Sequence, residues 1–289
     1  MMSSYKTLSV TAMESGFGAA ITGLDLAHPL PPETLTEVKQ AWSDHSVVYF
    51  PEQPLEHEQL EAFTEQIGDF GFDPFIEAMP QHPHILELRR EATEKTNNFG
   101  AAWHSDWSFQ EMPPSATILH AKVIPPVGGD TLYADCYRAF DALSPTMQKL
   151  LLNLNCIHSA ALAYSPRGLL AADPHEDQRS MQIHYADEAE KTCLHPLVRK
   201  HPVSGRLALY VNPVYTTAID GMTVEESYLL LSWLYEHIQK DEFVYRHHWQ
   251  ANMLTMWDNR CCNHYADGGY DGHLRVLHRT TVRGEKPAQ

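Results

Sequence analysis

The stretch WHSDWSF (residues 103–109), followed far downstream by His264, carries the pattern from which the rest of this chain can be interpreted. If residues 104–106 form a strand, His104 and Asp106 point to the same face, because side chains alternate along a strand with a period of two. One distant histidine then completes a set of two imidazoles and one carboxylate. Such a set binds non-haem Fe(II) and leaves coordination positions open for other ligands. The sequence therefore predicts a metal site at His104, Asp106 and His264.

The charge of the chain argues against nucleic acid as a partner. The 289 residues include 21 Lys and Arg against 37 Asp and Glu, a formal net charge of −16 at pH 7. A field of this sign repels a phosphate backbone. A small anionic substrate would therefore need local arginines, and Arg275 and Arg279 follow His264 in strand-like sequence. Four residues apart on a strand, their guanidinium groups share a face.

The five cysteines indicate a reducing compartment. Their number is odd, no Cys-x-x-Cys pair occurs, and Cys261 and Cys262 are adjacent. This is not the pattern of a disulfide framework. The first ten residues, MMSSYKTLSV, lack a basic region followed by an apolar one, and no run of about 18 apolar residues occurs. We expect a cytoplasmic protein with no signal peptide and no membrane span.

Periodicity predicts many short strands with helices packed around them. The expected helices cover residues 32–43, 56–67, 137–153 and 223–240, and the last begins at a capping box, Thr223-x-x-Glu226. The expected strands cover residues 17–26, 46–50, 85–89, 117–123, 131–134, 207–212, 243–249, 253–257 and 274–282. This pattern is typical of a β-sandwich or barrel-like core with helices outside. Residues 159–190 have little periodicity, and a loop of that length is usually functional or mobile, so they are a candidate lid.

At these residues the chain resembles the family of Fe(II)- and 2-oxoglutarate-dependent oxygenases that includes taurine dioxygenase and phenoxyacetate-herbicide dioxygenase. The matching stretches, in family order and spacing, are WHSDWSF (103–109), GGDTLYAD (128–135), HPLVRKHPVSGRLALYVN (195–212) and WDNRCCNHYADGGYDGHLRVLHRTTVRGEKP (257–287). A looser resemblance covers nearly the whole chain. It implies a mainly β fold with flanking helices around a double-stranded β-helix (jelly-roll) core, in a single dioxygenase domain over residues 1–289.

The resemblance also implies roles for individual residues. His104, Asp106 and His264 match the iron ligands. Thr131 and Arg275 match the residues that hold the distal carboxylate of 2-oxoglutarate. An arginine suits that role because its guanidinium donates two parallel hydrogen bonds to a carboxylate, which a lysine cannot reproduce. No catalytic residue is expected beyond the metal centre.

The substrate positions depart from those of the taurine enzyme, although Arg279 matches the position that binds the anionic head group of taurine. The other substrate positions fall by alignment on Asp73, Ile76, Gly100, Tyr164 and Tyr215, and none of these is the residue found in the taurine enzyme. Gly100 removes side-chain volume from the pocket. We expect a substrate with an acidic head and a bulkier, less polar body than taurine, such as an alkyl sulfate, a sulfonate or an aryloxyalkanoate. Asp73 leaves a second interpretation open, in which it meets a cation on the substrate.

The implied function is that of an Fe(II)- and 2-oxoglutarate-dependent dioxygenase. Such an enzyme uses O2 to hydroxylate a small anionic substrate (sulfonate, sulfate ester, aryloxyalkanoate or related carboxylate) and releases succinate and CO2. The alternative is a non-catalytic β-barrel protein in which the same residues hold a structural metal ion or an anion. A structural zinc site is closed and usually contains cysteine, and no fourth ligand is suggested near this triad. Family members are often dimers or tetramers, so we expect a homo-oligomer.

Overall fold

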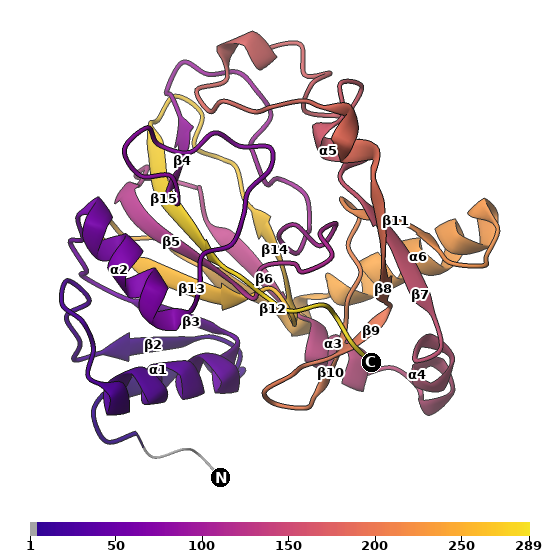
Figure 1. Cartoon of the computed structure of the whole chain (residues 1–289), viewed down its shortest axis with the longest axis horizontal. Helices are drawn as coiled ribbons and strands as arrows, with labels where there is room; N and C mark the ends of the chain where they lie inside the picture. The colour runs from indigo at the N-terminus through magenta and orange to yellow at the C-terminus, as the bar shows by residue number, and fades with distance from the viewer. Residues whose placement is uncertain (1–4) are drawn as a thin grey trace.

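A seven-stranded sheet is the largest element of the structure, a computed structural model that describes residues 5–289 (Figure 1). Its strands, in spatial order, are β1 (Ser9–Ala12), β2 (Ala19–Thr22), β3 (Val47–Phe50), β13 (Leu254–Asp258), β5 (Ala116–Val123), β15 (Arg275–Val282) and β4 (Leu86–Arg90). All neighbours run antiparallel except β2 and β3. Six of the predicted strands are confirmed in this sheet. The first four residues of the expected domain lie outside the described part of the chain.

A three-stranded sheet packs against the large one. It consists of β12 (Val244–His247), β6 (Thr131–Asp135) and β14 (Cys262–Ala266), which are antiparallel. Aromatic contacts join the two sheets. The rings of Tyr133 on β6 and Trp257 on β13 lie 5.4 Å apart, and those of His247 on β12 and Tyr49 on β3 lie 5.1 Å apart. The predicted turn between β12 and β13 therefore carries the chain from one sheet to the other.

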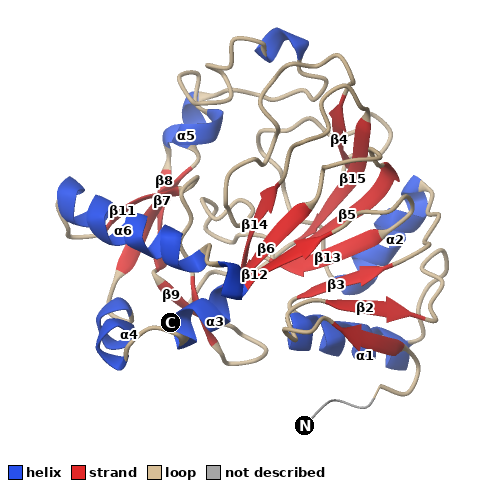
Figure 2. Cartoon of the chain, turned by 180° about the vertical axis from the view of Figure 1, so that it is seen from behind, coloured by secondary structure: helices blue, strands red, loops and turns tan. Residues whose placement is uncertain are grey.

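Two smaller sheets lie on the side of the molecule that carries α6 (Val224–Ile238) (Figure 2). One contains β11 (Thr216–Ile219), β7 (Asn155–Ser159) and β8 (Thr192–Pro196), and the other pairs β10 (Leu207–Leu209) with β9 (Val198–Lys200). Of these strands the sequence predicted only β10, and gave it as too long. Runs of four or five mixed residues, such as NCIHS in β7, are too short for a clear alternation of polar and apolar residues.

Helices α1 (Pro32–His45) and α2 (His57–Ile67) lie beside the large sheet, as predicted (Figure 1). Val38 on α1 and Phe63 on α2 are fully buried in one cluster with Val48 of β3 and Met256 of β13. Pro32 occupies the first helical position, where its missing N–H removes no helical hydrogen bond. These helices supply the apolar cover that the outer face of the sheet requires.

The predicted helix over residues 137–153 is wrong, because the chain forms two short helices there. Helix α3 spans Cys136–Asp141 and helix α4 spans Pro145–Leu151. Ser144 caps α4, since its Oγ accepts a hydrogen bond of 3.3 Å from the N–H of Met147. Proline lacks an N–H and disfavours a helical residue before it, so Pro145 starts a helix here and cannot continue one.

Helix α6 begins at the predicted capping box. Oγ1 of Thr223 accepts from the N–H of Glu226 at 3.2 Å, and Oε2 of Glu226 accepts from the N–H of Thr223 at 2.9 Å. Both hydrogen bonds satisfy donors that a helix start leaves open. Within residues 5–289, no helix combines the length and apolar character needed to cross a membrane.

Residues 159–190 form the long irregular segment that the sequence predicted, at the top of the view in Figure 1. It contains only α5 (Ala161–Tyr164) and two 3-10 turns, η1 (Glu176–Gln178) and η2 (Asp187–Glu190). A further 3-10 turn, η3, covers Asp241–Phe243. Two hydrogen bonds of 2.7 Å tie the segment to the loop after β4, from Ser180 Oγ to Glu94 Oε2 and from Asn97 N to Asp173 Oδ2. Its role as a lid stays a prediction.

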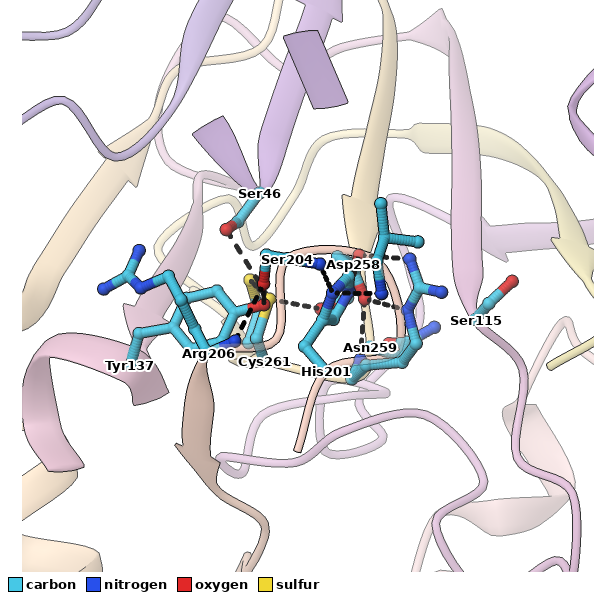
Figure 3. Close-up of polar contacts among 12 residues, drawn as sticks. Ser46, Ser115, Tyr137, His201, Ser204, Arg206, Asp258, Asn259 and Cys261 are labelled. Atoms are coloured by element: carbon cyan, nitrogen blue, oxygen red, sulfur yellow. Dashed lines mark hydrogen bonds and ion pairs between the residues drawn. The ribbon is translucent and has the colours of Figure 1, made fainter. Parts of the chain in front are cut away.

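A buried ion pair closes the end of β13 (Figure 3). Oδ2 of Asp258 accepts hydrogen bonds from Arg260 Nη2 at 2.6 Å and His201 Nε2 at 3.0 Å, and Oδ1 accepts from Arg260 Nε at 2.8 Å. Burial raises the pKa of Asp258, but Arg260 and His201 outweigh it and hold that pKa well below its usual value. His201 is therefore a structural residue.

We expect Asp258→Asn to lower the free energy of unfolding by about 3 kcal/mol at neutral pH, because Arg260 then stays buried without its main partner. The folded-state pKa of Asp258 is depressed, so its stabilisation is present above the unfolded pKa of about 4 and is lost as the pH falls below it. Urea unfolding at several pH values checks this expectation. The difference in the free energy of unfolding between the wild type and Asp258→Asn should become smaller in acid. A difference that stays constant down to pH ~3 contradicts the expectation.

Candidate metal centre and its surroundings

His104, Asp106 and His264 converge on one point. One ligand atom from each lies within 4.8 Å of the other two, and within residues 5–289 no other group of three such side chains does so. Oδ1 of Asp106 lies 3.5 Å from Nε2 of His104 and 3.8 Å from Nε2 of His264. All three side chains are buried. The structure therefore brings together the set that the sequence proposed.

A backbone bridge holds the two histidines together. His104 N donates to His264 O at 3.0 Å, and His264 N donates to His104 O at 2.7 Å. His264 belongs to β14, whereas His104 makes only this isolated bridge. The chain then turns, with Trp107 at a φ of 44°. The expected strand over residues 104–106 is therefore wrong, and the turn, rather than strand alternation, aims Asp106 at the histidines.

Two residues that sequence reasoning missed fix the carboxylate. Thr117 on β5 donates from Oγ1 to Asp106 Oδ2 at 2.6 Å. Asn259 donates from Nδ2 to Thr117 Oγ1 at 2.9 Å and accepts from the N–H of Asp106 at 3.3 Å. Asn259 lies in WDNRCCNH, part of a stretch that matches the family, so the sequence offered a reason to consider it. The role of Thr117 can be recognised only from the fold. With Oδ2 fixed in this way, Oδ1 faces the two imidazoles.

The protonation states suit a divalent metal ion. His104 Nδ1 lies 2.7 Å from the carbonyl oxygen of Ala102, which can only accept, so Nδ1 carries the proton and Nε2 offers a lone pair. Burial lowers the pKa of His264 well below its usual value and keeps that ring neutral. Burial raises the pKa of Asp106, but the adjacent positive charge of Arg279 outweighs it and holds that pKa well below its usual value. Two imidazoles and one carboxylate form a set that first-row metal ions accept.

Arg279 lies between the carboxylate and an indole ring. Its Nη2 is 2.9 Å from Asp106 Oδ1, and its guanidinium carbon is 3.7 Å from the centre of the Trp107 ring. The side chain is 3% exposed. Its strand, β15, pairs with both β4 and β5. Arg279 is therefore a fixed positive charge directly beside the triad.

Arg275 and Thr131 line a cavity that also borders His104, His264 and Arg279. Arg275 Nη2 donates to the carbonyl oxygen of Gly129 at 3.0 Å, and Thr131 Oγ1 accepts from Trp249 Nε1 at 3.0 Å. The cavity that borders the triad histidines is lined by both residues. A Cβ on Gly129 would lie 3.1 Å from Arg275 Nε, so glycine leaves room for that guanidinium. Burial lowers the pKa of Arg275, with only tyrosines and one aspartate opposing it.

Two cavities meet at Arg279. The one beside the triad is also lined by Gly100 and by Met181 of the irregular segment. A Cβ on Gly100 would lie 3.6 Å from Cε1 of His104, so this glycine keeps space open beside the metal site. The second cavity is lined by Asp73, Ile76 and Arg279. Met181 was missed by sequence reasoning, because its position depends on how the long segment folds back.

Tyr164 and Tyr215 pack in an aromatic cluster with Phe75 and Phe109 and line neither of these cavities. Tyr164 stacks on Phe75 with ring centres 4.9 Å apart, and Tyr215 contacts Phe109 at 5.0 Å. The ring of Tyr215 lies 6.2 Å from that of His104. Tyr215 is therefore near the triad, and Tyr164 belongs to the same aromatic cluster.

Comparisons with known proteins agree with this site. The sequence profile of the family Taurine catabolism dioxygenase TauD, TfdA matches residues 9–281. The alpha-ketoglutarate-dependent 2,4-dichlorophenoxyacetate dioxygenase of Cupriavidus pinatubonensis is 35% identical over 283 residues, covering 92% of this chain and 94% of the relative. The alpha-ketoglutarate-dependent sulfate ester dioxygenase of Pseudomonas putida is 30% identical, covering 97% and 91%.

Solved structures give the same result. A taurine dioxygenase from Burkholderia xenovorans superposes with a TM-score of 0.81 at 30% identity, covering 98% of this chain and 91% of the other. AAD-2 in complex with Mn(II) and N-oxalylglycine superposes with a TM-score of 0.78 at 32% identity, covering 98% and 100%. The chain therefore belongs to the TauD/TfdA family and is an alpha-ketoglutarate-dependent dioxygenase.

Proposed function

We propose that this enzyme uses Fe(II), 2-oxoglutarate and O2 to hydroxylate a small anionic organic molecule, with succinate and CO2 as co-products. The observation that carries the proposal is the convergence of His104, Asp106 and His264 next to Arg279, whose Nη2 is 2.9 Å from Asp106. The donor set fits Fe(II) because two imidazole nitrogens and one carboxylate bind this ion and leave coordination positions free. Bound iron would supply the activation of O2 and of the keto acid.

The chain's own residues would place the two organic molecules. Arg275 would grip the distal carboxylate of 2-oxoglutarate through two parallel hydrogen bonds, with Thr131 beside it. Arg279 would pair with the acidic head of the substrate. Because these guanidinium groups are 8% and 3% exposed, water competes weakly for them and each ion pair is strengthened. Gly100 and Met181 would shape the cavity that Arg275 and Arg279 line. Tyr164 and Tyr215 would support this cavity through the aromatic cluster with Phe75 and Phe109.

The relatives support an anionic substrate. Their names specify a 2,4-dichlorophenoxyacetate, sulfate esters and a sulfonate. Each of these substrates carries a negatively charged head group. We infer the same class here: a sulfonate, a sulfate ester, an aryloxyalkanoate or a related carboxylate. The non-catalytic binding protein considered above finds no support, because these relatives are enzymes.

The architecture fits the same proposal. Two sheets that are antiparallel except for the β2–β3 pair pack against each other, with the triad at their junction, and support a double-stranded β-helix core in a single domain. Residues 159–190 would act as the lid, since Met181 and Arg179 from this segment line the cavity beside the triad. Five unpaired cysteines support a reducing compartment such as the cytoplasm.

Asp106→Ala is expected to abolish succinate formation, because the metal loses its only anionic protein ligand. Succinate released from 2-oxoglutarate, measured across a panel of sulfonates, sulfate esters and aryloxyalkanoates, checks the expectation. Circular dichroism of the variant controls for folding, since Asp106 is 2% exposed and partners Thr117 and Arg279. Succinate release at the wild-type rate by the folded variant would show that the metal assignment is wrong.

Arg275→Gln and Arg279→Gln form a matched pair with opposite expectations. The first should raise the KM for 2-oxoglutarate roughly 100-fold, because two charge-assisted hydrogen bonds are lost. The second should raise the KM for the organic substrate by a similar factor while substrate-independent turnover of 2-oxoglutarate changes little. Steady-state kinetics on both substrates separate the two effects. Equal effects of both substitutions on the KM for 2-oxoglutarate would mean that Arg279 also serves the cosubstrate.

We also propose that the protein is a homo-oligomer and that α6 forms the contact with a second copy. Tyr228, Leu229 and Trp233 on this helix are 70%, 69% and 43% exposed, which leaves an apolar stripe in contact with water. The same helix of a second copy would cover this stripe and remove its apolar surface from water.

Trp233→Glu is expected to convert the oligomer to a monomer, because it places a charge in the centre of that stripe. Light scattering at fixed protein concentration measures the mass. Val203→Glu, at an apolar position that is 67% exposed outside α6, is the matched control and should leave the mass unchanged. If Trp233→Glu has the same mass in solution as the wild type and the Val203→Glu control, α6 is not the interface.

A further inference from the structure

Asp73 carries a buried oxygen without a partner. Its Oδ1 accepts hydrogen bonds from the backbone N–H groups of Phe75 at 3.2 Å and Ile76 at 3.1 Å. Its Oδ2 is buried and has no hydrogen-bond partner among residues 5–289. Buried acceptors are almost always paired, and an unpaired one is costly. The first oxygen therefore fixes the carboxylate to the backbone, and the second is available to a ligand.

The free oxygen belongs to the substrate side of the site. Asp73 and Arg279 line the same cavity, together with Ile76 and Leu86. Arg279 is already in contact with Asp106 and Trp107, and its positive charge also acts on the carboxylate of Asp73. Burial raises the pKa of Asp73 to about 6, although the charge of Arg279 and the two backbone hydrogen bonds oppose this rise. In mildly alkaline solution Asp73 is therefore ionised.

A plain anion fits this environment poorly. Once Asp106 binds the metal, the substrate side contains one positive charge from Arg279 and one negative charge from Asp73. An anion without a donor would pair with Arg279, add a second negative charge to buried space and leave Asp73 Oδ2 unsatisfied. An ammonium group on the same molecule would satisfy Oδ2 and restore neutrality. A buried polar group of this kind discriminates strongly against a ligand that lacks its partner.

We propose that Asp73 selects substrates that carry an amino group close to their acidic head, so that the enzyme acts on zwitterions of the amino acid or aminosulfonate class. Arg279 binds the acid and Asp73 binds the ammonium. The inference rests on the proposed function, because it assigns Arg279 to the substrate. Asp73 is then a specificity-determining residue.

The experiment compares pairs of ligands that differ only in the amino group. The probes are L-phenylalanine with 3-phenylpropanoate, L-norleucine with hexanoate, and taurine with ethanesulfonate. Calorimetry measures binding to the protein loaded with Mn(II) and 2-oxoglutarate without O2, in mildly alkaline buffer. The variants are Asp73→Asn, which keeps the backbone hydrogen bonds through its amide oxygen, and Asp73→Ala. Asp141→Asn is the control, because Asp141 is a surface residue paired with Arg206.

We expect the wild type and the control to bind the amino member of at least one pair tenfold or more tightly than its partner. Asp73→Asn should abolish that preference, because its amide donates where the carboxylate accepted. Equal or tighter binding of the amine-free member by the wild type overturns the inference, as does failure of all six probes to bind. Binding of an amine-free anion that survives Asp73→Asn but not Asp73→Ala also overturns it, because Asp73 would then act as a protonated donor.

A parallel assay separates this inference from the proposed function. Succinate formation is measured with the same six probes under air. If the amino preference holds in calorimetry while neither these probes nor the wider substrate panel yields succinate, the proposed function fails and the binding role of Asp73 stands. If succinate forms only with amine-free anions, the proposed function stands and the role of Asp73 is refuted.

Discussion

The paired backbone hydrogen bonds between His104 and His264 are the constraint on which the whole site depends. They join the loop that carries Asp106 to β14 of the smaller sheet, with N–O distances of 3.0 and 2.7 Å. The large sheet supplies Arg275 and Arg279 from β15. The site therefore exists only where the two sheets meet, and their aromatic contacts, such as Tyr133 with Trp257, fix its geometry. A site assembled on strands in this way is held more rigidly than one assembled on loops alone.

The local charge of the site opposes the charge of the whole chain. The protein has a net charge of −16, yet its central cavity presents buried guanidinium groups. Arg275 even lies opposite Arg90 across β15 and β4, where like charges destabilise a sheet. The ring of Tyr270 lies within 5.6 Å of both guanidinium groups and lessens that cost through cation–π contact. Arg90 forms an ion pair with Asp271 at 2.9 Å, whereas Arg275 has only a carbonyl oxygen as its hydrogen-bond acceptor among residues 5–289. The positive charge of Arg275 is therefore free for an acidic ligand, which is consistent with a site adapted to binding at some expense of stability.

The sequence predicted the chemistry of the site better than its local geometry. The convergence of His104, Asp106 and His264 could be predicted because metal ligands need particular side-chain types. The role of Arg275 followed from the family resemblance and stays a prediction. The strand over residues 104–106 was wrong because a single bridge followed by a turn has no period that a sequence can display. Thr117 escaped notice because its role depends on β5 passing behind Asp106, which is a tertiary contact. The single helix predicted over residues 137–153 was wrong for a local reason. Ser144-Pro145 is a helix start signal, and the apolar periodicity that continues through it led to one helix being predicted in place of two.

The central claim is that two imidazoles and one carboxylate bind iron while Arg275 holds the keto acid beside it. Anaerobic titration of the purified protein with Fe(II) and then 2-oxoglutarate tests this most directly, with visible absorption as the readout. The account predicts a weak visible band that needs both additions, saturates at one iron per chain, and is absent from a folded His264→Ala protein. A wild-type protein that binds iron without developing that band, or a variant that retains it, would contradict the account.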